Sequence, residues 1–510
     1  MMIPGLAALM ILSSLSGTPP TAEAHPVEVE VAEGRLAGSA GHGIARYLNV
    51  PYAAPPVGAL RWRPPQPARV WSGVRDATRR GPICIQPPAN GDNGVGPLPM
   101  SEDCLQLNVF APAGATGDTP VMVWIHGGGY VNGSATADLY DGTALARQGL
   151  VVVTINYRLG RLGFFDHPAL AQDRPADEPA GNYGVMDMIA ALDWVRRNVA
   201  AFGGDPAQVT IFGESAGGMA VLQLMTAPAA QGLFHRAVVQ SGPPRLPTRR
   251  LDRAGPRGEP SVQDAAVAWM AERGLGAASA DALRALPAEA FLQPWPSFRQ
   301  GVLNIVDGQV VPEPVMDAFA AGRQAKVPLI VGANSAEFFW VTADNPQEGT
   351  LDDAIPQAER AALIAAYGGT DAYRVHVISD LIFLEPARQI ARLHGRSGAP
   401  AWLYRFDVVS AAAPREPGGA GHAWDRQYVF HTLHASPWPT DDMDERAADL
   451  ISGYWAGFGR TGDPNGADRP VWPQAGDALT TLQFSNDGPQ LLEDPLGARL
   501  ELLARWQDRR

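Results

Sequence analysis

Short runs of consecutive apolar residues alternate with helical patterns through the middle of the chain. The runs at Val121–Ile125 and Leu150–Asn156 are continuous rather than alternating, which is typical of strands buried on both faces. The same pattern predicts further strands at Gln208–Phe212, Arg236–Gln240, Val327–Val331 and Trp402–Phe406. Strands separated by helices predict an α/β fold, with a central, mostly parallel sheet and helices on both faces.

The helical patterns complete this picture. Apolar residues recur at helical spacing over Tyr183–Phe202, and Gly203–Pro206 is expected to end that helix. Residues 261–320 and 351–395 are expected to be helical insertions that cap the sheet, and Pro243–Pro260 a surface loop. Two amphipathic helices are predicted at Asp444–Arg460 and Gly497–Arg509. With no internal repeat and no long linker, residues 25–510 are predicted to form a single domain.

The first 24 residues have the pattern of a signal peptide. An apolar run from Met1 to Gly17 precedes Ala22-Glu23-Ala24, a small–x–small site just before His25. Cleavage after Ala24 would export the protein to the periplasm or beyond the cell. No Lys or Arg lies near Met1, and a buried N-terminal helix is the alternative interpretation. The run is shorter than the ~20 residues of a membrane span.

Composition excludes several classes of function. The chain has 510 residues, 46% of them apolar and 18% charged, as expected of a globular protein. With 40 basic and 53 acidic residues, the net charge of −13 argues against binding to nucleic acid or to anionic membranes. Two cysteines, Cys84 and Cys104, are too few for a Cys-rich zinc module or an iron–sulfur cluster. In an exported protein they could form a disulfide, and free buried thiols are the alternative.

One motif carries specific chemistry. Gly213-Glu214-Ser215-Ala216-Gly217 follows a predicted strand and opens a predicted helix. A turn this sharp strains the central residue and needs small residues on either side. Ser215 would then lie at a helix N-terminus, where developing negative charge is favoured. The context indicates a nucleophilic serine, because the spacing of a phosphate-binding glycine loop is absent.

A nucleophilic serine also needs donors for the oxyanion that forms when it attacks. The segment His126-Gly127-Gly128-Gly129 follows the predicted strand at Val121–Ile125. Backbone N–H groups of Gly128, Gly129 and Ala216 are the predicted donors. His126 is expected to have a structural role.

The base and the acid should follow the serine in the sequence. Of the downstream histidines, His422 lies in a glycine-rich loop after the strand at Trp402–Phe406, where such a fold places its base. His376 and His394 fall in helical segments. His431 and His434 are expected to be structural, although position alone leaves them open as bases. Glu337, just past the strand at Val327–Val331, is the candidate acid, with a surface glutamate as the alternative.

Together these residues resemble the type-B carboxylesterase family, which includes the cholinesterases. The resemblance rests on ordered blocks along the mature chain, of which Thr210–Gly218 is the most specific. The other blocks are Asn49–Ala53, Ser101–Leu105, His126–Gly129, Asn156–Gly160, Phe202–Pro206, Gln240–Gly242 and Gly332–Glu337. The resemblance implies an α/β-hydrolase with a Ser215–His422–Glu337 triad. It also implies a Cys84–Cys104 disulfide and two ion pairs, Arg61 with Glu102 and Arg158 with Asp187.

The chain departs from the family pattern beside the triad. The family has glycine after the acid, whereas Phe338-Phe339-Trp340 follows Glu337 here. After the histidine the family has a small residue and then an acidic residue with an Ile-Pro-like pair, whereas Ala423-Trp424-Asp425-Arg426-Gln427 follows His422 here. These changes affect the expected substrate range and leave the mechanism intact. The predicted pocket residues are Trp295, Phe298, Phe338, Phe339, Trp424, Arg161 and Arg426.

The sequence therefore predicts a serine carboxylic-ester hydrolase that needs no metal or organic cofactor. Its partner would be a small ester that is bulky, aromatic or carboxylate-bearing, and the protein would be a monomer or a weak dimer. The carboxylate preference depends on Arg161 and Arg426, although a surface or packing role is the simpler interpretation of Arg161. The alternatives are a lipase for long-chain esters and a catalytically silent binding protein, because fold alone does not determine function.

Overall fold

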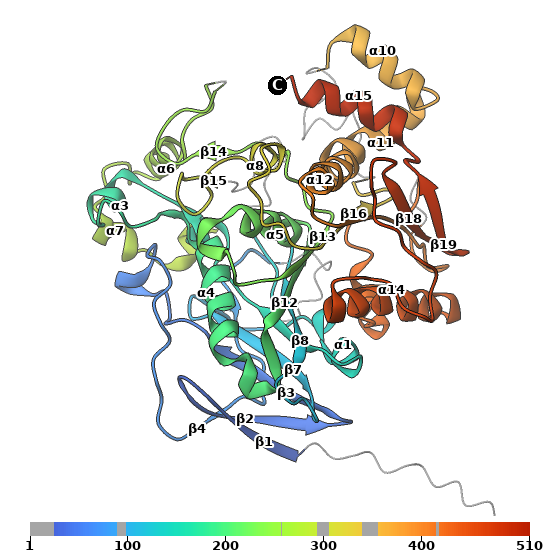
Figure 1. Cartoon of the computed structure of the whole chain (residues 1–510). Coiled ribbons are helices and arrows are strands. Elements are labelled where there is room, and N and C mark those ends of the chain that lie inside the picture. The colour runs from blue at the N-terminus through green and yellow to red at the C-terminus, as the bar shows by residue number, and fades with distance from the viewer. Residues whose placement is uncertain are drawn as a thin grey trace, which may run out of the picture.

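The computed structural model describes residues 25–88, 98–256, 258–292, 305–338, 355–414 and 418–509, and a 13-stranded sheet runs through them (Figure 1). In spatial order its strands are β1 (His25–Val31), β2 (Gly34–Gly41), β3 (Ile44–Pro51), β7 (Gln106–Pro112), β9 (Val151–Ile155), β8 (Thr119–Ile125), β12 (Gly204–Glu214), β13 (Arg236–Gln240), β16 (Leu329–Asn334), β17 (Ala401–Asp407), β18 (Thr480–Ser485) and β19 (Gly488–Glu493). Strand β4 (Val74–Asp76) pairs with β2. From β9 to β18 every pairing is parallel, which confirms the predicted mostly parallel sheet.

Both faces of the central strands are buried. Along β8, Val121 and Val123 join one hydrophobic cluster, while Met122 and Trp124 join another. Successive side chains of a strand point to opposite faces, so each cluster belongs to one face of the sheet. This two-sided burial explains why the strands appear in the sequence as continuous apolar runs.

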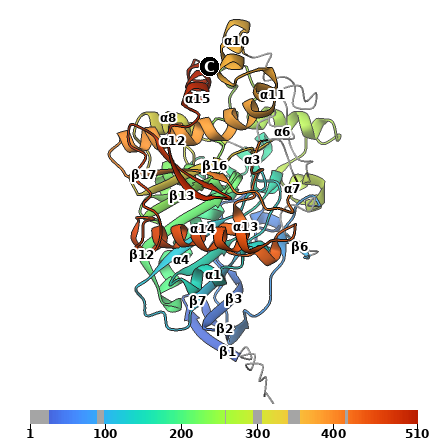
Figure 2. The ribbon, with the colours of Figure 1, turned by 90° about the vertical axis from the view of Figure 1, so that its right-hand side faces the viewer.

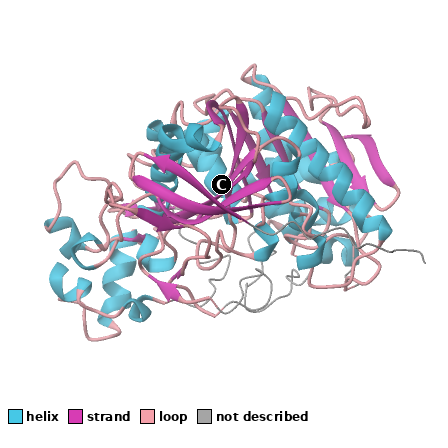
Figure 3. Cartoon of the chain, turned by 90° about the horizontal axis from the view of Figure 1, so that it is seen from below, coloured by secondary structure: helices cyan, strands magenta, loops and turns pink. Residues whose placement is uncertain are grey.

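Helices cover both faces of the sheet, as Figures 2 and 3 show. Helices α4 (Tyr183–Asn198), α5 (Ala216–Thr226) and α12 (Glu385–Arg396) contribute to the first cluster. Helices α1 (Thr143–Arg147) and α14 (Asp442–Thr461) contribute to the second. After α4, a 3₁₀ turn η3 (Val199–Phe202) ends at Gly203 with φ +79°, as the glycine pattern predicted.

Helical insertions lie beyond the sheet. They are α6 (Val262–Ala271), α7 (Ala280–Arg284), α8 (Val315–Ala320), α10 (Gln357–Ala366), α11 (Thr370–Ser379), the π-helix η7 (Asp380–Leu384) and the C-terminal α15 (Gly497–Gln507). Shorter elements are β5 (Ile83–Cys84), β6 (Met100–Ser101), η2 (Asp138–Tyr140), α2 (Gly160–Gly163), β10 (Phe164–Phe165), α3 (Pro168–Gln172), β11 (Gly181–Asn182) and α13 (Arg426–Val429). The expected loop Pro243–Pro260 contains a short strand, β14 (Arg249–Arg250), which pairs with β15 (Ile305–Val306).

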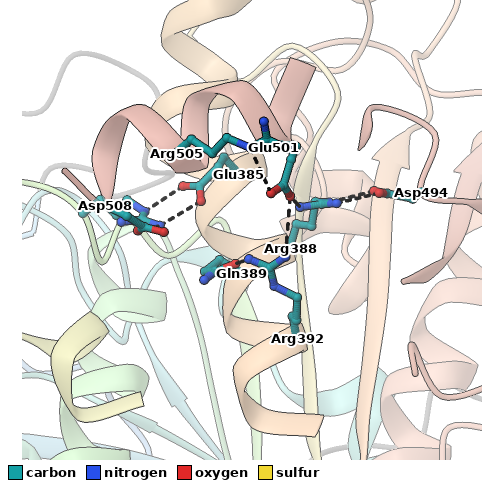
Figure 4. Close-up of polar contacts among 9 residues, drawn as sticks. Glu385, Arg388, Gln389, Arg392, Asp494, Glu501, Arg505 and Asp508 are labelled. Atoms are coloured by element: carbon teal, nitrogen blue, oxygen red, sulfur yellow. Dashed lines mark hydrogen bonds and ion pairs between the residues drawn. The ribbon is translucent and has the colours of Figure 1, made fainter. Parts of the chain in front are cut away.

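Helix α15 is held against α12 by a network of charged side chains (Figure 4). Arg388 donates to Asp494 at 2.6 and 2.7 Å and to Glu501 at 3.2 Å. Glu385 accepts two hydrogen bonds from Arg245, at 2.7 and 2.9 Å. Arg499 of α15 also pairs with Asp380 of η7 at 2.6 Å, so charged contacts join α15 to η7 as well as to α12.

The covalent and ionic links that the family resemblance implied are present. Cys84 and Cys104 form a disulfide with a Cα–Cα distance of 5.1 Å. Close by in the sequence, Glu102 accepts from Arg61 at 2.6 and 2.7 Å. Asp187 likewise accepts two hydrogen bonds of 2.8 Å from Arg158. Such paired contacts of arginine with carboxylate are strong and geometrically specific.

Within the described ranges, no helix is long and apolar enough to cross a membrane.

Candidate active site

Ser215 occupies the sharp turn between β12 and α5. Its backbone has φ +58° and ψ −120°, and its N–H donates to the carbonyl of Gln240 at 2.9 Å. A Cβ on Gly217 would lie 2.0 Å from the carbonyl oxygen of Ile125, and one on Gly213 would lie 2.6 Å from Gly217. Positive φ is costly for a serine, so the surrounding structure holds this strain in place. The glycines on either side are required by close backbone approach, as the motif predicted.

His422 lies between Ser215 and Glu337. Its Nε2 is 2.8 Å from Oγ of Ser215, and its Nδ1 makes a short hydrogen bond to Oε2 of Glu337. Glu337 follows β16 and His422 follows the neighbouring strand β17, so the parallel sheet brings their loops to one edge. Among the five downstream histidines that the sequence offered, the structure brings His422 to the serine.

The carboxylate of Glu337 is fully buried and held in one orientation. Its Oε1 accepts from the hydroxyl of Ser241 and from the N–H of Asn334, the latter at 2.6 Å, which leaves Oε2 for His422. In the sequence, Ser241 is noticeable only as part of Gln240–Gly242, one of the segments that resemble the carboxylesterase family. Its contact with Glu337 joins residues 96 positions apart, which sequence spacing does not reveal.

Hydrogen bonds also join the loop of His422 to the loop of Glu337. Asn334 Nδ2 donates to the carbonyl of Gly421 at 2.7 Å, and the N–H of His422 donates to the carbonyl of Glu337 at 2.8 Å. Ser335 Oγ accepts from the N–H of Ala420 at 2.7 Å. The base and the acid are thus carried by two loops that several hydrogen bonds join to each other.

The glycine loop after β8 lies against the serine. A Cβ on Gly127 would lie 3.2 Å from Cβ of Ser215, and Gly128 and Gly129 have φ of +107° and +59°. In the described part of the chain, none of the N–H groups of Gly128, Gly129 and Ala216 donates to a protein acceptor. Unpaired N–H groups beside a nucleophile suit the binding of an oxyanion.

Glu214 is a site residue that the sequence interpretation did not single out. Its side chain is buried, and its Oε1 lies 3.3 Å from Nε2 of His422. Burial raises the pKa of Glu214 to about 7. Glu214 is the last residue of β12 and occupies the variable position just before the serine of the G-x-S-x-G motif. That position was the one signal in the sequence that could have indicated a role for it.

These charges also control His422. Burial lowers the pKa of its imidazole, but the carboxylates of Glu214 and Glu337 outweigh burial and raise it to about 9. His126, by contrast, is buried, and burial lowers its pKa to about 4. The ring of His126 stacks on Tyr157 at 4.4 Å, and its Nδ1 contacts the carbonyl of Gly127 at 2.8 Å. His431 contacts Glu445 at 3.0 Å, away from Ser215.

Of the predicted pocket aromatics, Phe338 contacts the site directly. Its ring centroid lies 4.7 Å from that of His422. Phe383 of η7, which the sequence did not suggest, lies 4.9 Å from the same ring. Trp424 packs on Trp438 at 4.7 Å and belongs to the second hydrophobic cluster. The predicted residues Trp295, Phe298 and Phe339 lie outside the described residues.

The two predicted arginines have different surroundings. Arg161 lies 4.1 Å above the ring of Trp269, and Arg273 approaches the same ring at 4.1 Å. Burial, and then the charge of Arg273, lower the pKa of Arg161 to about 10. Arg426 is buried beside the loop of His422 and donates to the hydroxyl of Tyr140 at 3.0 Å.

The fold and the Ser–His–Glu arrangement define an α/β-hydrolase of the serine esterase type. Residues 25–368 and 369–494 match the family model described as the carboxylesterase family, and the chain belongs to that family. The chain is 36% identical to the para-nitrobenzyl esterase of Bacillus subtilis (strain 168) over 465 residues, 86% of this chain and 91% of that protein. It is 35% identical to the fumonisin B1 esterase of Sphingopyxis macrogoltabida, over 84% of this chain and 81% of that one.

Solved structures agree with the sequence relatives. A PNB esterase structure superposes with a TM-score of 0.79 at 31% identity, and the match covers 93% of this chain and 99% of the other. A carboxylesterase of Geobacillus stearothermophilus superposes with a TM-score of 0.76 at 33% identity, with the same coverage. The protein is therefore a carboxylic ester hydrolase.

Proposed function

We propose that Ser215 is the nucleophile of this esterase, His422 its general base and Glu337 the group that orients the imidazole. The observation that carries the proposal is the 2.8 Å contact of Ser215 Oγ with His422 Nε2, on a ring whose Nδ1 is held by Glu337. Glu337 fixes the tautomer that leaves Nε2 free to accept a proton, and its charge stabilises the imidazolium.

The reaction then follows from this geometry. Ser215 Oγ forms a bond to the ester carbonyl carbon while its proton passes to Nε2 of His422. The N–H groups of Gly128, Gly129 and Ala216 bind the oxyanion, and the loss of one such donor typically lowers kcat by about 10²–10³. The bond to the alcohol oxygen breaks as His422 returns its proton to that oxygen. Water then repeats the sequence on the acyl-enzyme and releases the acid.

The preferred substrates in this proposal are small esters with bulky or aromatic groups. The rings of Phe338 and Phe383 against His422 support it, and so does the similarity to a para-nitrobenzyl esterase. Trp295, Phe298 and Phe339 remain candidate walls. The proposal keeps Arg161, whose guanidinium lies 4.1 Å from the ring centroid of Trp269, as the candidate cation for a narrower preference for esters that carry a free carboxylate.

The proposal extends to location and domain organisation. Residues 1–24 act as a signal peptide cleaved after Ala24, and strand β1 begins at the next residue, His25. Export suits the Cys84–Cys104 disulfide, since such bonds persist in oxidising compartments. Residues 25–510 act as a single hydrolase domain, in the periplasm or outside the cell.

Hydrolysis of p-nitrophenyl acetate and p-nitrophenyl benzoate by the purified protein tests the proposal. Ser215→Ala should reduce kcat/KM by about 10³-fold or more, because the nucleophile is lost. Ser261→Ala, which removes a buried serine at the start of α6, is the matched control and should retain activity. A Ser215→Ala variant as active as wild type would refute the assignment, as would a fluorophosphonate that labels a residue other than Ser215.

The carboxylate preference needs its own comparison. Arg161→Met should lower kcat/KM for the p-nitrophenyl monoester of succinate and leave that for p-nitrophenyl butyrate unchanged. An equal effect on both esters would assign Arg161 to packing against Trp269.

A further inference from the structure

Three buried carboxylates interact with His422, two by direct contact with its ring and Asp425 through its charge. Glu337 binds Nδ1, Glu214 lies 3.3 Å from Nε2, and Asp425 follows three residues later in the chain and accepts from Gln240 at 2.6 Å. Each carboxylate belongs to a residue that exposes 1% or less of its surface. Buried charges of one sign disfavour one another's ionisation, so this cluster requires a compensating positive charge.

Arg426 supplies such a charge at the start of α13. It exposes 5% of its surface. Burial raises the pKa of Glu214 and of Asp425, and the positive charge of Arg426 opposes both shifts. The same charge opposes the upward shift of the His422 pKa. Arg426 therefore favours ionised carboxylates and a neutral imidazole, which is the state a general base requires.

Two phenols also face this cluster. The hydroxyl of Tyr404 on β17 lies 3.5 Å from Asp425, and Tyr157 interacts with Glu214. Burial raises the pKa of both phenols well above the ordinary value, so they remain neutral.

The guanidinium also holds the backbone that follows His422. Nε of Arg426 donates to the carbonyl of Ala423 at 2.9 Å, and Nη1 donates to Tyr140 at 3.0 Å. Ala423 has φ +65°, a conformation that residues with a Cβ rarely adopt. Tyr140 packs at 5.0 Å on Trp124 of β8, the strand that leads into the glycine loop. Arg426 thus connects the strained turn after the base to the core of the sheet.

We propose that Arg426 is a positioning residue for ester hydrolysis, which holds the turn after His422 and balances the carboxylates around the imidazole. The inference rests on the proposed roles of Ser215, His422 and Glu337. Arg426 then has a task within the protein rather than in binding the substrate. Lysine cannot substitute fully, because a guanidinium presents its donors in a planar fork and an ammonium does not.

The test compares Arg426→Met and Arg426→Lys with Arg61→Met, using the pH dependence of kcat/KM for p-nitrophenyl acetate. Arg61 is a matched control, because it is similarly buried but pairs with Glu102 and not with a carboxylate of this cluster. The acid limb is the low-pH part of the profile, in which kcat/KM rises as the base loses its proton. Arg426→Met should move this limb to higher pH by about one unit. Arg426→Lys should keep the limb close to that of wild type but lower kcat, since the fork is lost.

Several results would overturn the inference. They are an unchanged limb in Arg426→Met, an equal shift in Arg61→Met, or an Arg426→Lys variant with the kcat of wild type. If Arg426→Met does not fold, Tyr140→Phe is informative, because it keeps the charge and removes one anchor. It should lower kcat without moving the limb, and an unchanged kcat would contradict the positioning role. Wild type without Ser215-dependent hydrolysis would instead refute the proposed function itself.

Discussion

Oε1 of Glu214 lies 3.3 Å from Nε2 of His422, the ring nitrogen that also faces Ser215, and it accepts no hydrogen bond among the described residues. The carboxylate is therefore placed to interact with the imidazolium rather than with the neutral ring. Glu214 stabilises the protonated state that forms during each half of the reaction, and it also raises the pKa of the resting base.

This relationship predicts an opposite effect to that of Arg426→Met. Glu214→Gln removes the largest of the contributions that raise the His422 pKa, so that pKa should fall from about 9 toward its ordinary value. A base works when it is neutral, and neutral imidazole appears as pH rises through its pKa. The acid limb of kcat/KM should therefore move to lower pH by about one unit or more.

The measurement is the pH profile of kcat/KM with p-nitrophenyl acetate. Because His422 titrates together with Glu214 and Glu337, the pKa of the acid limb belongs to these residues jointly. Glu445→Gln is the control, because Glu445 contacts His431 and not His422. A limb that stays in place or rises in Glu214→Gln would contradict the electrostatic role of Glu214.

A second prediction concerns the two loops that carry base and acid. Ser335 accepts from the N–H of Ala420 and makes a short hydrogen bond to Asp407. Ser335→Ala should lower kcat by about tenfold with little change in KM, because one buried hydrogen bond holding the His422 loop is lost. Ser410→Ala removes a similarly buried serine that donates to Asp444 at 2.8 Å, and it should leave kcat unchanged. If both variants lowered kcat equally, the effect of Ser335→Ala would reflect the loss of any buried hydrogen bond and not a role in holding the His422 loop.

A third prediction concerns substrate range. Phe338 occupies the position after the acid, where the family has glycine, and its ring lies against His422. Phe338→Ala should increase the ratio of kcat/KM for p-nitrophenyl pivalate to that for the acetate by about tenfold, because space opens beside the imidazole. Phe458→Leu, a change in the buried core of α14, is the control for lost stability. A constant ratio in Phe338→Ala would mean that this ring does not limit the acyl group.

A fourth prediction concerns the disulfide. The double variant Cys84→Ser/Cys104→Ser should lose about 3 kcal/mol of unfolding free energy in urea, since the bond closes a loop of 20 residues. Dithiothreitol should lower the unfolding free energy of wild type toward that of the variant, and it should leave the unfolding free energy of the variant unchanged. Equal stability of wild type and variant would show that the bond adds nothing to the folded state.

Much of this architecture could be predicted from local sequence. Strands β8 and β9 are buried on both faces and therefore appear as continuous apolar runs. The turn at Ser215 requires glycine on both sides, so its spacing is visible in the sequence. His422 and Glu337 follow neighbouring parallel strands, and the family resemblance distinguished them from other candidates.

The contacts that tune the site could not be predicted in this way. Phe383 reaches His422 from a π-helix inside a helical insertion, where its apolar side chain resembles any other core residue. Arg426 was expected in the substrate pocket, but it is buried and bonded to Tyr140, 286 positions away in the sequence. Such pairings depend on how distant segments pack, and no periodicity or motif encodes them.

The attachment of α15 has a practical consequence for handling the protein. Its Glu501 binds Arg388 of α12, and α12 continues from η7, which places Phe383 on the ring of His422. The final turns of the polypeptide therefore support one wall of the catalytic imidazole through two packed helices. We therefore expect that trimming the C-terminus, or fusing a tag that displaces α15, lowers the activity of the enzyme.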